Sequence, residues 1–164
     1  MASDAPVLPA LAVSRADVAR LLRELESLED YLHQALLRTS DAATIKLPKM
    51  SRVMDELAMG NKKNLLQSAD RKELMTFIKS IHDHAPVVHM SFAVEPSASF
   101  LQKLIVWWRS EIGPYVLLET GLQPDIAVGC FVRTPNHQYD FSLREHFTKT
   151  RDVLVQKLEA GLTS

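Results

Sequence analysis

The sequence predicts an α+β protein in which an N-terminal helical segment precedes a β-α-β-β-β-α domain with a small mixed sheet. Two observations carry this prediction. Apolar residues recur with a helical period through the first half of the 164 residues, and the period changes to two after Pro86. Glycines, prolines and capping residues then divide the second half into short elements. We therefore expect a flexible Ala/Pro-rich tail over 1–13, a helical domain over 14–86 and an α+β domain over 87–164.

The first helix is predicted over 14–38. Ser14 and Asp17 resemble a capping box, with Asp in place of the usual Glu. Beyond them, two rows of residues at heptad spacing share one apolar face: Val18, Leu25 and Leu32, and Leu21, Leu28 and Ala35. This face fits either packing inside a helical bundle or the docking of a partner helix, and three heptads do not decide between the two.

Two more helices are predicted before Pro86. Pro48 opens the second helix, and Gly60 predicts a left-handed residue at its end. One face of this helix is apolar, formed by Met50, Val53, Met54 and Leu57. The third helix begins near Asp70 and ends before Pro86, because a proline disfavours helical geometry at the residue before it.

Strands and helices alternate after Pro86. Apolar and polar residues alternate over 88–94, which is typical of a strand with one buried face. The next elements are a helix over 97–112, strands over 115–122, 127–134 and 137–139, and a final helix that a capping box of Ser142 and Glu145 opens.

The helix over 97–112 carries two kinds of apolar residue. One row is expected to face the core: Leu101, Leu104, Ile105, Trp108 and Ile112. Phe100, Lys103 and Trp107 lie on a different stripe, and large aromatic residues outside the core-facing row indicate an interface. These three are the candidate partner-binding residues. The alternative is that the N-terminal helices cover them.

Composition excludes several classes of protein. The formal net charge is −1 and charged residues make up 24% of the chain, so no basic excess predicts a nucleic-acid partner. The longest apolar runs are far shorter than the ~20 residues that span a bilayer, so we expect no direct membrane insertion. A single cysteine excludes an intramolecular disulfide.

Candidate chemical sites are weak. His82 and His84 point in opposite directions on a helix, so they cannot hold one metal ion while helical. Cys130 has no recognisable base beside it and is read as a small apolar residue. Ser142 and His146 lie one turn apart, but the capping box already explains Ser142. With no glycine-rich phosphate loop, we expect no catalytic, cofactor-binding or metal site, and no enzyme activity.

Residues 125–147 carry the most specific pattern. Gly129 is followed by three apolar residues and Arg133, and seven residues later come Asp140 and Ser142, with a basic first helical turn. This spacing resembles the C-terminal signature of ATP synthase delta subunits, called oligomycin-sensitivity-conferral protein in mitochondria. Val128 and Phe141 stand where that family commonly has glycine. Each motif residue also has a structural explanation.

Those explanations come from backbone geometry and local hydrogen bonding. Gly129 allows a close approach of another segment. Asp140 and Ser142 close the hairpin and begin the last helix. Arg133 is expected to pair with a carboxylate near that corner.

The resemblance implies a non-catalytic subunit of the peripheral stalk, or stator, of an F-type ATP synthase. Such a subunit links the catalytic head to the membrane-anchored stalk during ATP synthesis driven by proton or sodium ion transport. Its partners are the b-type stalk subunit, held by the domain over 87–164, and the alpha subunits of the head, contacted by the helical domain. It needs no cofactor and lies peripherally, on the cytoplasmic side of the energy-transducing membrane. The alternatives are an adaptor or regulatory module with the same fold and another partner, or an enzyme with an unrecognised site.

Overall fold

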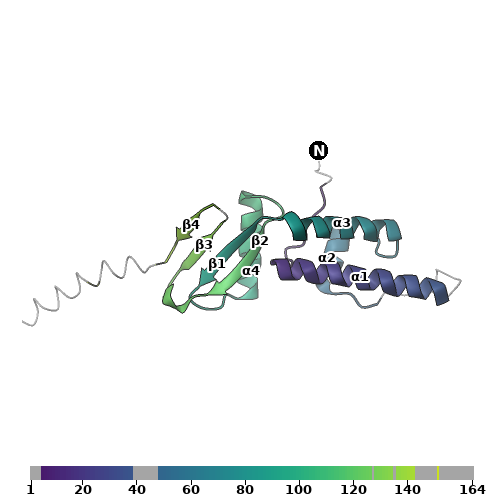
Figure 1. Ribbon diagram of the computed structural model, residues 1–164, viewed down its shortest axis with the longest axis horizontal. Helices are drawn as coiled ribbons and strands as arrows, with labels where there is room; N and C mark the ends of the chain where they lie inside the picture. The colour runs from purple at the N-terminus through teal and green to yellow at the C-terminus, as the bar shows by residue number, and fades with distance from the viewer. Residues whose placement is uncertain (1–4, 39–47, 127, 135, 143–150, 152–164) are drawn as a thin grey trace, which may run out of the picture. The chain divides into compact units, whose positions relative to one another are not determined.

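The computed structural model describes residues 5–38, 48–126, 128–134, 136–142 and 151. Within these residues the chain forms four α-helices, a short 3-10 helix and a four-stranded mixed sheet (Figure 1). This confirms the predicted α+β class. The final helix expected after Ser142 lies outside the described residues.

The chain divides into two compact units. The first, here called the helical unit, comprises Met1–Val87 and Ala98–Leu118, and the second, the sheet unit, comprises Val88–Ser97 and Glu119–Ser164. The break after Val87 falls one residue from the boundary predicted at Pro86. Helix α4 (Ala98–Glu111), however, groups with the helical unit, whereas the sequence assigned it to the domain over 87–164.

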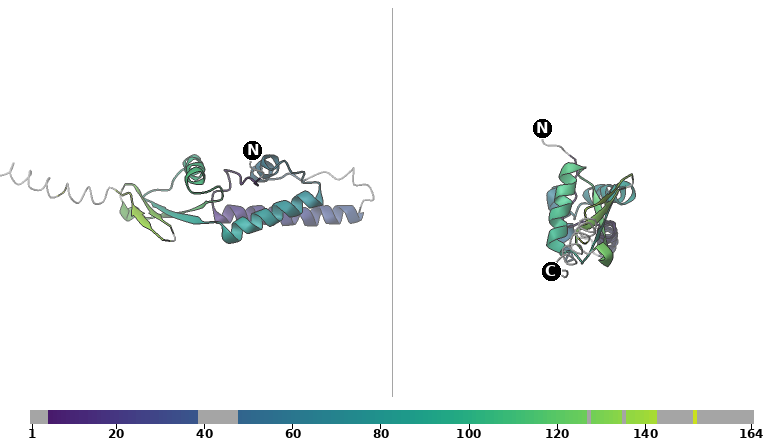
Figure 2. Two further views of the ribbon diagram at one scale, coloured as in Figure 1. Left: turned by 90° about the horizontal axis from the view of Figure 1, so that it is seen from above. Right: turned by 90° about the vertical axis from the view of Figure 1, so that its left-hand side faces the viewer.

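The helical unit is built on α1 (Arg15–Arg38), α2 (Arg52–Gly60) and α3 (Ser68–His84). Helices α1 and α3 lie side by side (Figures 1 and 2). The buried face of α1 is the apolar face predicted from the heptad rows: Val18, Leu21, Leu25, Leu28 and Leu32. It packs in one cluster with residues of α2 and α3, such as Met54, Leu57, Leu74 and Ile78. The face is therefore used inside the unit, as the bundle interpretation expects.

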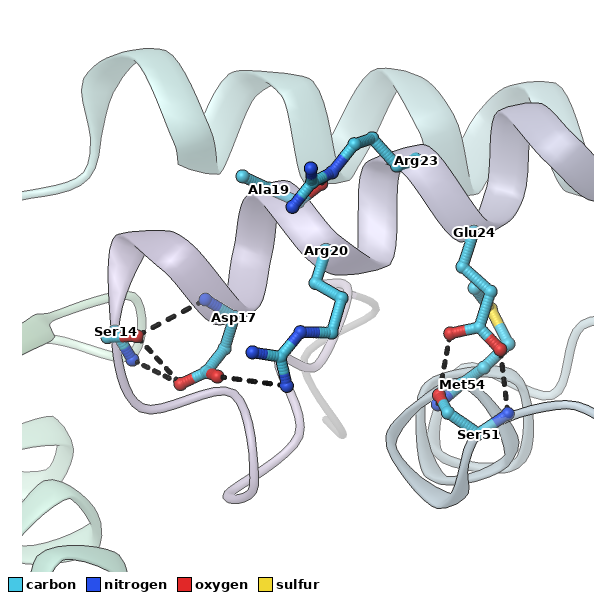
Figure 3. Close-up of polar contacts among 8 residues, drawn as sticks. All are labelled: Ser14, Asp17, Ala19, Arg20, Arg23, Glu24, Ser51 and Met54. Carbon is cyan, nitrogen blue, oxygen red and sulfur yellow. Dashed lines mark hydrogen bonds and ion pairs between the residues drawn. The ribbon is translucent and has the colours of Figure 1, made fainter.

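Polar contacts determine where α1 and α2 begin. The capping box at Ser14 is confirmed: its backbone N–H donates to Asp17 Oδ2 at 2.9 Å, and the Asp17 N–H donates to Ser14 Oγ at 3.2 Å. Helix α2 begins after Ser51, three residues beyond Pro48. The Ser51 Oγ accepts the N–H of Met54 at 3.2 Å and donates to Glu24 Oε2 at 2.6 Å (Figure 3). A carboxylate on α1 thereby fixes the first turn of α2.

The end of α2 differs from the prediction. Gly60 is still helical, and the left-handed residue is Lys62, with a φ of 53°. The Lys63 N–H donates to the Ala58 carbonyl at 2.9 Å, which is the closing bond of a Schellman motif. Asn61 adds a side-chain bond from Nδ2 to the Leu57 carbonyl at 2.7 Å. These bonds, together with the hydrogen bonds between Asn61 and Val7 of the N-terminal segment, favour a left-handed turn at Lys62. This is two residues later than Gly60 alone indicates.

An ion pair between a buried arginine and a half-buried glutamate joins α1 to α3. Arg71 is only 3% exposed, and its Nε donates to Glu29 while its Nη1 donates to the Leu65 carbonyl at 2.9 Å. The hydrogen bond from Arg71 holds the pKa of Glu29 below its ordinary value. The pair ties the middle of α1 to the first turns of α3.

The N-terminal segment over 5–13 is not the flexible tail expected from its composition. Leu8, Pro9 and Ala12 are buried, and Leu8 and Ala12 belong to the core cluster of the helical unit. The expectation was wrong for these residues because a short extended segment without periodicity gives no local signal of burial.

The sheet has the strand order β2-β1-β3-β4. Strands β1 (Val87–Phe92), β2 (Leu117–Leu122), β3 (Cys130–Arg133) and β4 (Gln138–Asp140) match the four predicted strands within a few residues. β3 pairs antiparallel with both β1 and β4. Every second residue of β1 is buried, namely Val88, Met90 and Phe92, as the alternation predicts.

Candidate docking surface

Helix α4 presents the aromatic residues that the sequence singled out. Phe100 is 46% exposed, Trp107 is 52% exposed, and Lys103 between them is exposed as well. The structure thus places all three candidate residues at the surface of the described chain. Val106, which the sequence analysis did not single out, adds another exposed apolar side chain to this helix.

The core-facing row of α4 is only partly as expected. Ile105 is fully buried, while Leu101, Leu104 and Trp108 are half-buried. Ile112 was expected in the core and is instead 52% exposed. It directly follows the last residue of α4, Glu111, and its N–H still donates to the Trp108 carbonyl at 2.9 Å.

Trp107 and Trp108 support one another although they lie on different faces. Their ring centroids are 4.9 Å apart with an interplanar angle of 65°, the edge-to-face geometry that aromatic pairs favour. The indole N–H of Trp108 is buried and has no hydrogen-bond partner within the described residues. The half-buried Trp108 thus packs against the exposed Trp107 ring. A large, exposed and pre-positioned aromatic side chain is typical of a protein-binding hot spot.

The corner formed by Gly129, Asp140 and Ser142 is closed by backbone contacts. Gly129 has a φ of +106°, and a Cβ added there would lie 2.3 Å from the Phe141 carbonyl oxygen and 2.7 Å from the Ser142 Cα. The Ser142 N–H donates to Asp140 Oδ1 at 2.7 Å, and the Phe141 N–H donates to the Cys130 carbonyl at 2.9 Å. The close approach that the glycine predicted is therefore present.

Arg133 differs from its expected role. Its side chain is exposed and its Nη2 donates to Gln138 Oε1 at 3.3 Å across the β3–β4 pair. The expected carboxylate partner is not among its contacts within the described residues, because the neighbouring position on β4 carries an amide. His89, which lies opposite Arg133 in the β1–β3 register, has its Nδ1 3.2 Å from Glu119 Oε2.

A cavity of about 520 Å³ lies beside these residues in the sheet unit. His89, Glu119, Arg133 and Gln138 line it together with Ser91. Its lining carries the acidic side chain of Glu119, the basic side chain of Arg133 and several hydrogen-bonding groups. No hydrogen bond joins Ser91 to His89 in the described part of the chain.

The weaker sequence candidates have local partners. His82 Nδ1 lies 2.9 Å from Asp83 Oδ1, and His84 Nδ1 lies 3.2 Å from the Ser80 carbonyl oxygen. Burial raises the pKa of the half-buried Cys130 thiol, which makes it less reactive. Among the residues that the structure describes, no three His, Cys, Asp or Glu side chains come together as a metal site.

Sequence reasoning missed an aromatic row on the last described hairpin. His137, Tyr139 and Phe141 stack in succession, with ring centroids 5.9 Å and 6.1 Å apart. Their i, i+2 spacing was the available signal, since alternate residues of a strand share one face.

Two further findings bear on the candidate function. No described helix combines the length and the hydrophobicity needed to cross a membrane. In comparisons with known proteins, the sequence matches no family model and no curated protein.

Proposed function

We propose that this chain is a delta-type subunit of the peripheral stalk of an F-type ATP synthase, where it links the catalytic head to the b-type stalk subunit. The observation that carries the proposal is the corner built from Gly129, Asp140 and Ser142. These residues have the spacing of the delta-subunit signature. Their contacts also give that spacing a physical reason, since only glycine allows the backbone at Phe141 to approach so closely.

The exposed aromatic face of α4 supports a docking role. Trp107 is presented on a helix and held at its edge by Trp108, and Phe100 and Lys103 lie on the same stripe. Such a face suits an amphipathic helix, which would bury apolar side chains on the indole and place a carboxylate near the lysine. In the proposed complex this helix is the C-terminal end of the b-type subunit.

The mechanism is mechanical and needs no cofactor. A rotary motor performs work only when its head is held against the torque of the turning shaft. The chain would resist that torque through protein contacts alone, with helices α1 to α3 toward the alpha subunits and α4 toward the stalk. Interface area and pre-positioned aromatic residues set the strength of such a link.

Co-purification tests the function directly. The full chain carrying an affinity tag is expressed in its source cells, and membranes are solubilised before capture and mass spectrometry. We expect the alpha and b-type subunits to be recovered together with the chain. Recovery of a different, reproducible partner would contradict the stalk assignment and favour the adaptor alternative.

A binding measurement then tests the surface. The probe is a peptide with the sequence of the C-terminal end of the b-type subunit. We expect Trp107→Ala to weaken binding of this peptide by about 2 kcal/mol, or roughly 30-fold, if the indole is a hot spot. Leu66→Ala is the matched control, because Leu66 is a similarly exposed apolar residue away from α4. Unchanged peptide affinity in Trp107→Ala, with normal thermal stability, would place the stalk contact elsewhere.

A further inference from the structure

The cavity of about 520 Å³ in the sheet unit lies over the less buried face of the sheet. Alternate residues of β1 are buried, and His89 and Ser91 are the residues between them. Across the β1–β3 pair, His89 lies opposite Arg133 and Ser91 lies opposite Phe131. Pockets that bind small molecules commonly have volumes of about 300–1,000 Å³, so this cavity is large enough for such a ligand.

One end of the cavity carries the charged side chains. Glu119 Oε2 lies 3.2 Å from His89 Nδ1, so this carboxylate already has a partner. Arg133 has only a neutral one: its Nη2 donates to the amide oxygen of Gln138 at 3.3 Å. The other two nitrogens of its guanidinium, Nε and Nη1, make no hydrogen bond within the described residues. The group at this end that still has donors to offer is therefore a cation.

These free donors favour a carboxylate as the ligand group. The N–H groups of a guanidinium form a planar fork that matches the two oxygens of a carboxylate, and such bonds are stronger than those between neutral groups. Glu119 holds the imidazole of His89 through Nδ1, which leaves Nε2 on the other side of the ring. Arg133 and His89 are both exposed, so a ligand can reach them without any rearrangement of the chain.

The other end of the cavity offers an aromatic ring beside a hydroxyl group. Phe131 is half-buried and lines the cavity together with Ser91, its partner in the register. The Ser91 hydroxyl makes no hydrogen bond within the described residues. A ligand that covers the Phe131 ring removes apolar surface from water, which is favourable. This end therefore favours an apolar group, and an aromatic one above all.

Gly121 keeps the apolar end free of a further side chain. It lies within β2, where a glycine weakens a strand because it costs entropy and packs against nothing. Its φ lies outside the left-handed region, and a Cβ added there would meet only Ser91 Oγ, at 3.5 Å, among the described residues. Neither backbone conformation nor the approach of another backbone segment accounts for this glycine. A close approach of a ligand is another common reason for glycine inside a strand.

We propose that Arg133, Phe131 and Gly121 form a binding site for a small organic carboxylate that carries an aromatic group a short chain away from its acid group. The carboxylate accepts hydrogen bonds from Arg133, and the aromatic group lies over Gly121 against Phe131. Residues two apart on a strand are separated by about 7 Å, which sets the distance between the two ends of the ligand. The site is separate from the α4 face assigned to the stalk, so the two proposals stand or fall separately.

The test is a titration of the full, isotope-labelled chain with 3-phenylpropanoate, followed by the NMR signals of the backbone amides. Low ionic strength is used because salt screens an exposed charge. We expect saturable shifts centred on Ser91, Gly121 and Phe131, with a dissociation constant on the order of 1 mM or below. 3-Phenylpropanamide has the same shape without the charge, and we expect it to bind about fivefold or more weakly.

Two variants identify the site. Arg133→Gln is expected to weaken binding of 3-phenylpropanoate about fivefold or more, because the charged donor is lost. Arg20→Gln is the matched control, since it removes the same charge from an exposed position on α1 and is expected to leave the affinity unchanged. Gly121→Val places a side chain where the aromatic group would lie, and it is expected to abolish binding. This variant should fold, because a Cβ has room there and valine is favourable in strands.

Several outcomes would overturn the proposal. One is the absence of saturable shifts in the unmodified chain, and another is a set of shifts centred outside the cavity. Equal affinity for the acid and the amide would show that no cation reads the carboxylate, and this comparison needs no variant to fold. A folded Arg133→Gln or Gly121→Val chain that binds 3-phenylpropanoate as well as the unmodified chain would also count against the site.

Discussion

Gly129 shows how much a single residue can decide. Its φ of +106° and the 2.3 Å approach to the Phe141 carbonyl leave no room for a side chain. We expect Gly129→Ala to lower the free energy of unfolding by about 2 kcal/mol or more, from backbone strain and the displaced strand end. Gly113→Ala is the matched control, because nothing lies within 4 Å of an added Cβ there. Chemical denaturation of both variants checks this, and equal effects would contradict the role assigned to Gly129.

The ion pair of Glu29 and Arg71 gives stability a pH dependence at the same scale. Because the folded-state pKa of Glu29 is lowered, its contribution is complete above the ordinary value of 4.5 and is lost as pH falls through the folded value. We expect Glu29→Gln to destabilise the chain by about 1–3 kcal/mol at neutral pH, since Arg71 remains buried.

Thermal melting between pH 7 and about pH 3 measures this effect. The loss of stability in acid is expected to be shallower in Glu29→Gln than in the unmodified chain. Glu26→Gln, on the same helix but exposed, is expected to follow the unmodified chain. If all three proteins lose stability in acid to the same extent, the assignment to Glu29 is contradicted.

At the scale of elements, α2 depends on contacts at its first turn. It has only 9 residues, and helices this short are marginal without tertiary support. Ser51 both caps α2 and bonds to Glu24 on α1 (Figure 3). We expect Ser51→Ala to cost about 1–2 kcal/mol of stability, the usual range for a lost N-cap.

The neighbouring residue provides the control for α2. Arg52 is exposed and pairs with Glu56 one turn later, at 3.2 Å. An exposed pair of this kind contributes about 0.5 kcal/mol or less, so Arg52→Ala is expected to be nearly neutral. Urea unfolding followed by circular dichroism would compare the two variants. A larger loss in Arg52→Ala than in Ser51→Ala would be contrary to this account of the helix.

For the helical unit taken as a whole, Arg109 joins parts of the chain that are far apart in sequence. Its contact with Pro9 spans 100 residues. We expect Arg109→Gln to lower the unfolding free energy by about 2 kcal/mol, because several charge-assisted hydrogen bonds are lost together. Arg20→Gln, which removes an exposed arginine, is expected to change it by less than about 0.5 kcal/mol. Calorimetry on both variants measures the difference.

Local patterns were sufficient for the helices and strands of the described residues and for part of the candidate site. The burial of Leu21 and Leu25 follows from helical spacing, and that of Met90 from alternation, because these patterns involve residues close in sequence. The capping box at Ser14 and the close approach of another segment at Gly129 were predictable for the same reason. The exposure of Trp107 followed from its position on α4 relative to Ile105.

Contacts between distant segments were decided only by the tertiary structure. No local pattern indicates that Arg109 bonds the carbonyls of residues 8–12, or that α4 consequently groups with the helical unit rather than with the strands that flank it in sequence. The partner of Arg133 and the left-handed turn at Lys62 were mispredicted for a related reason. Several residues could satisfy each of those positions locally, and the choice among them depends on which distant backbone groups the fold brings near.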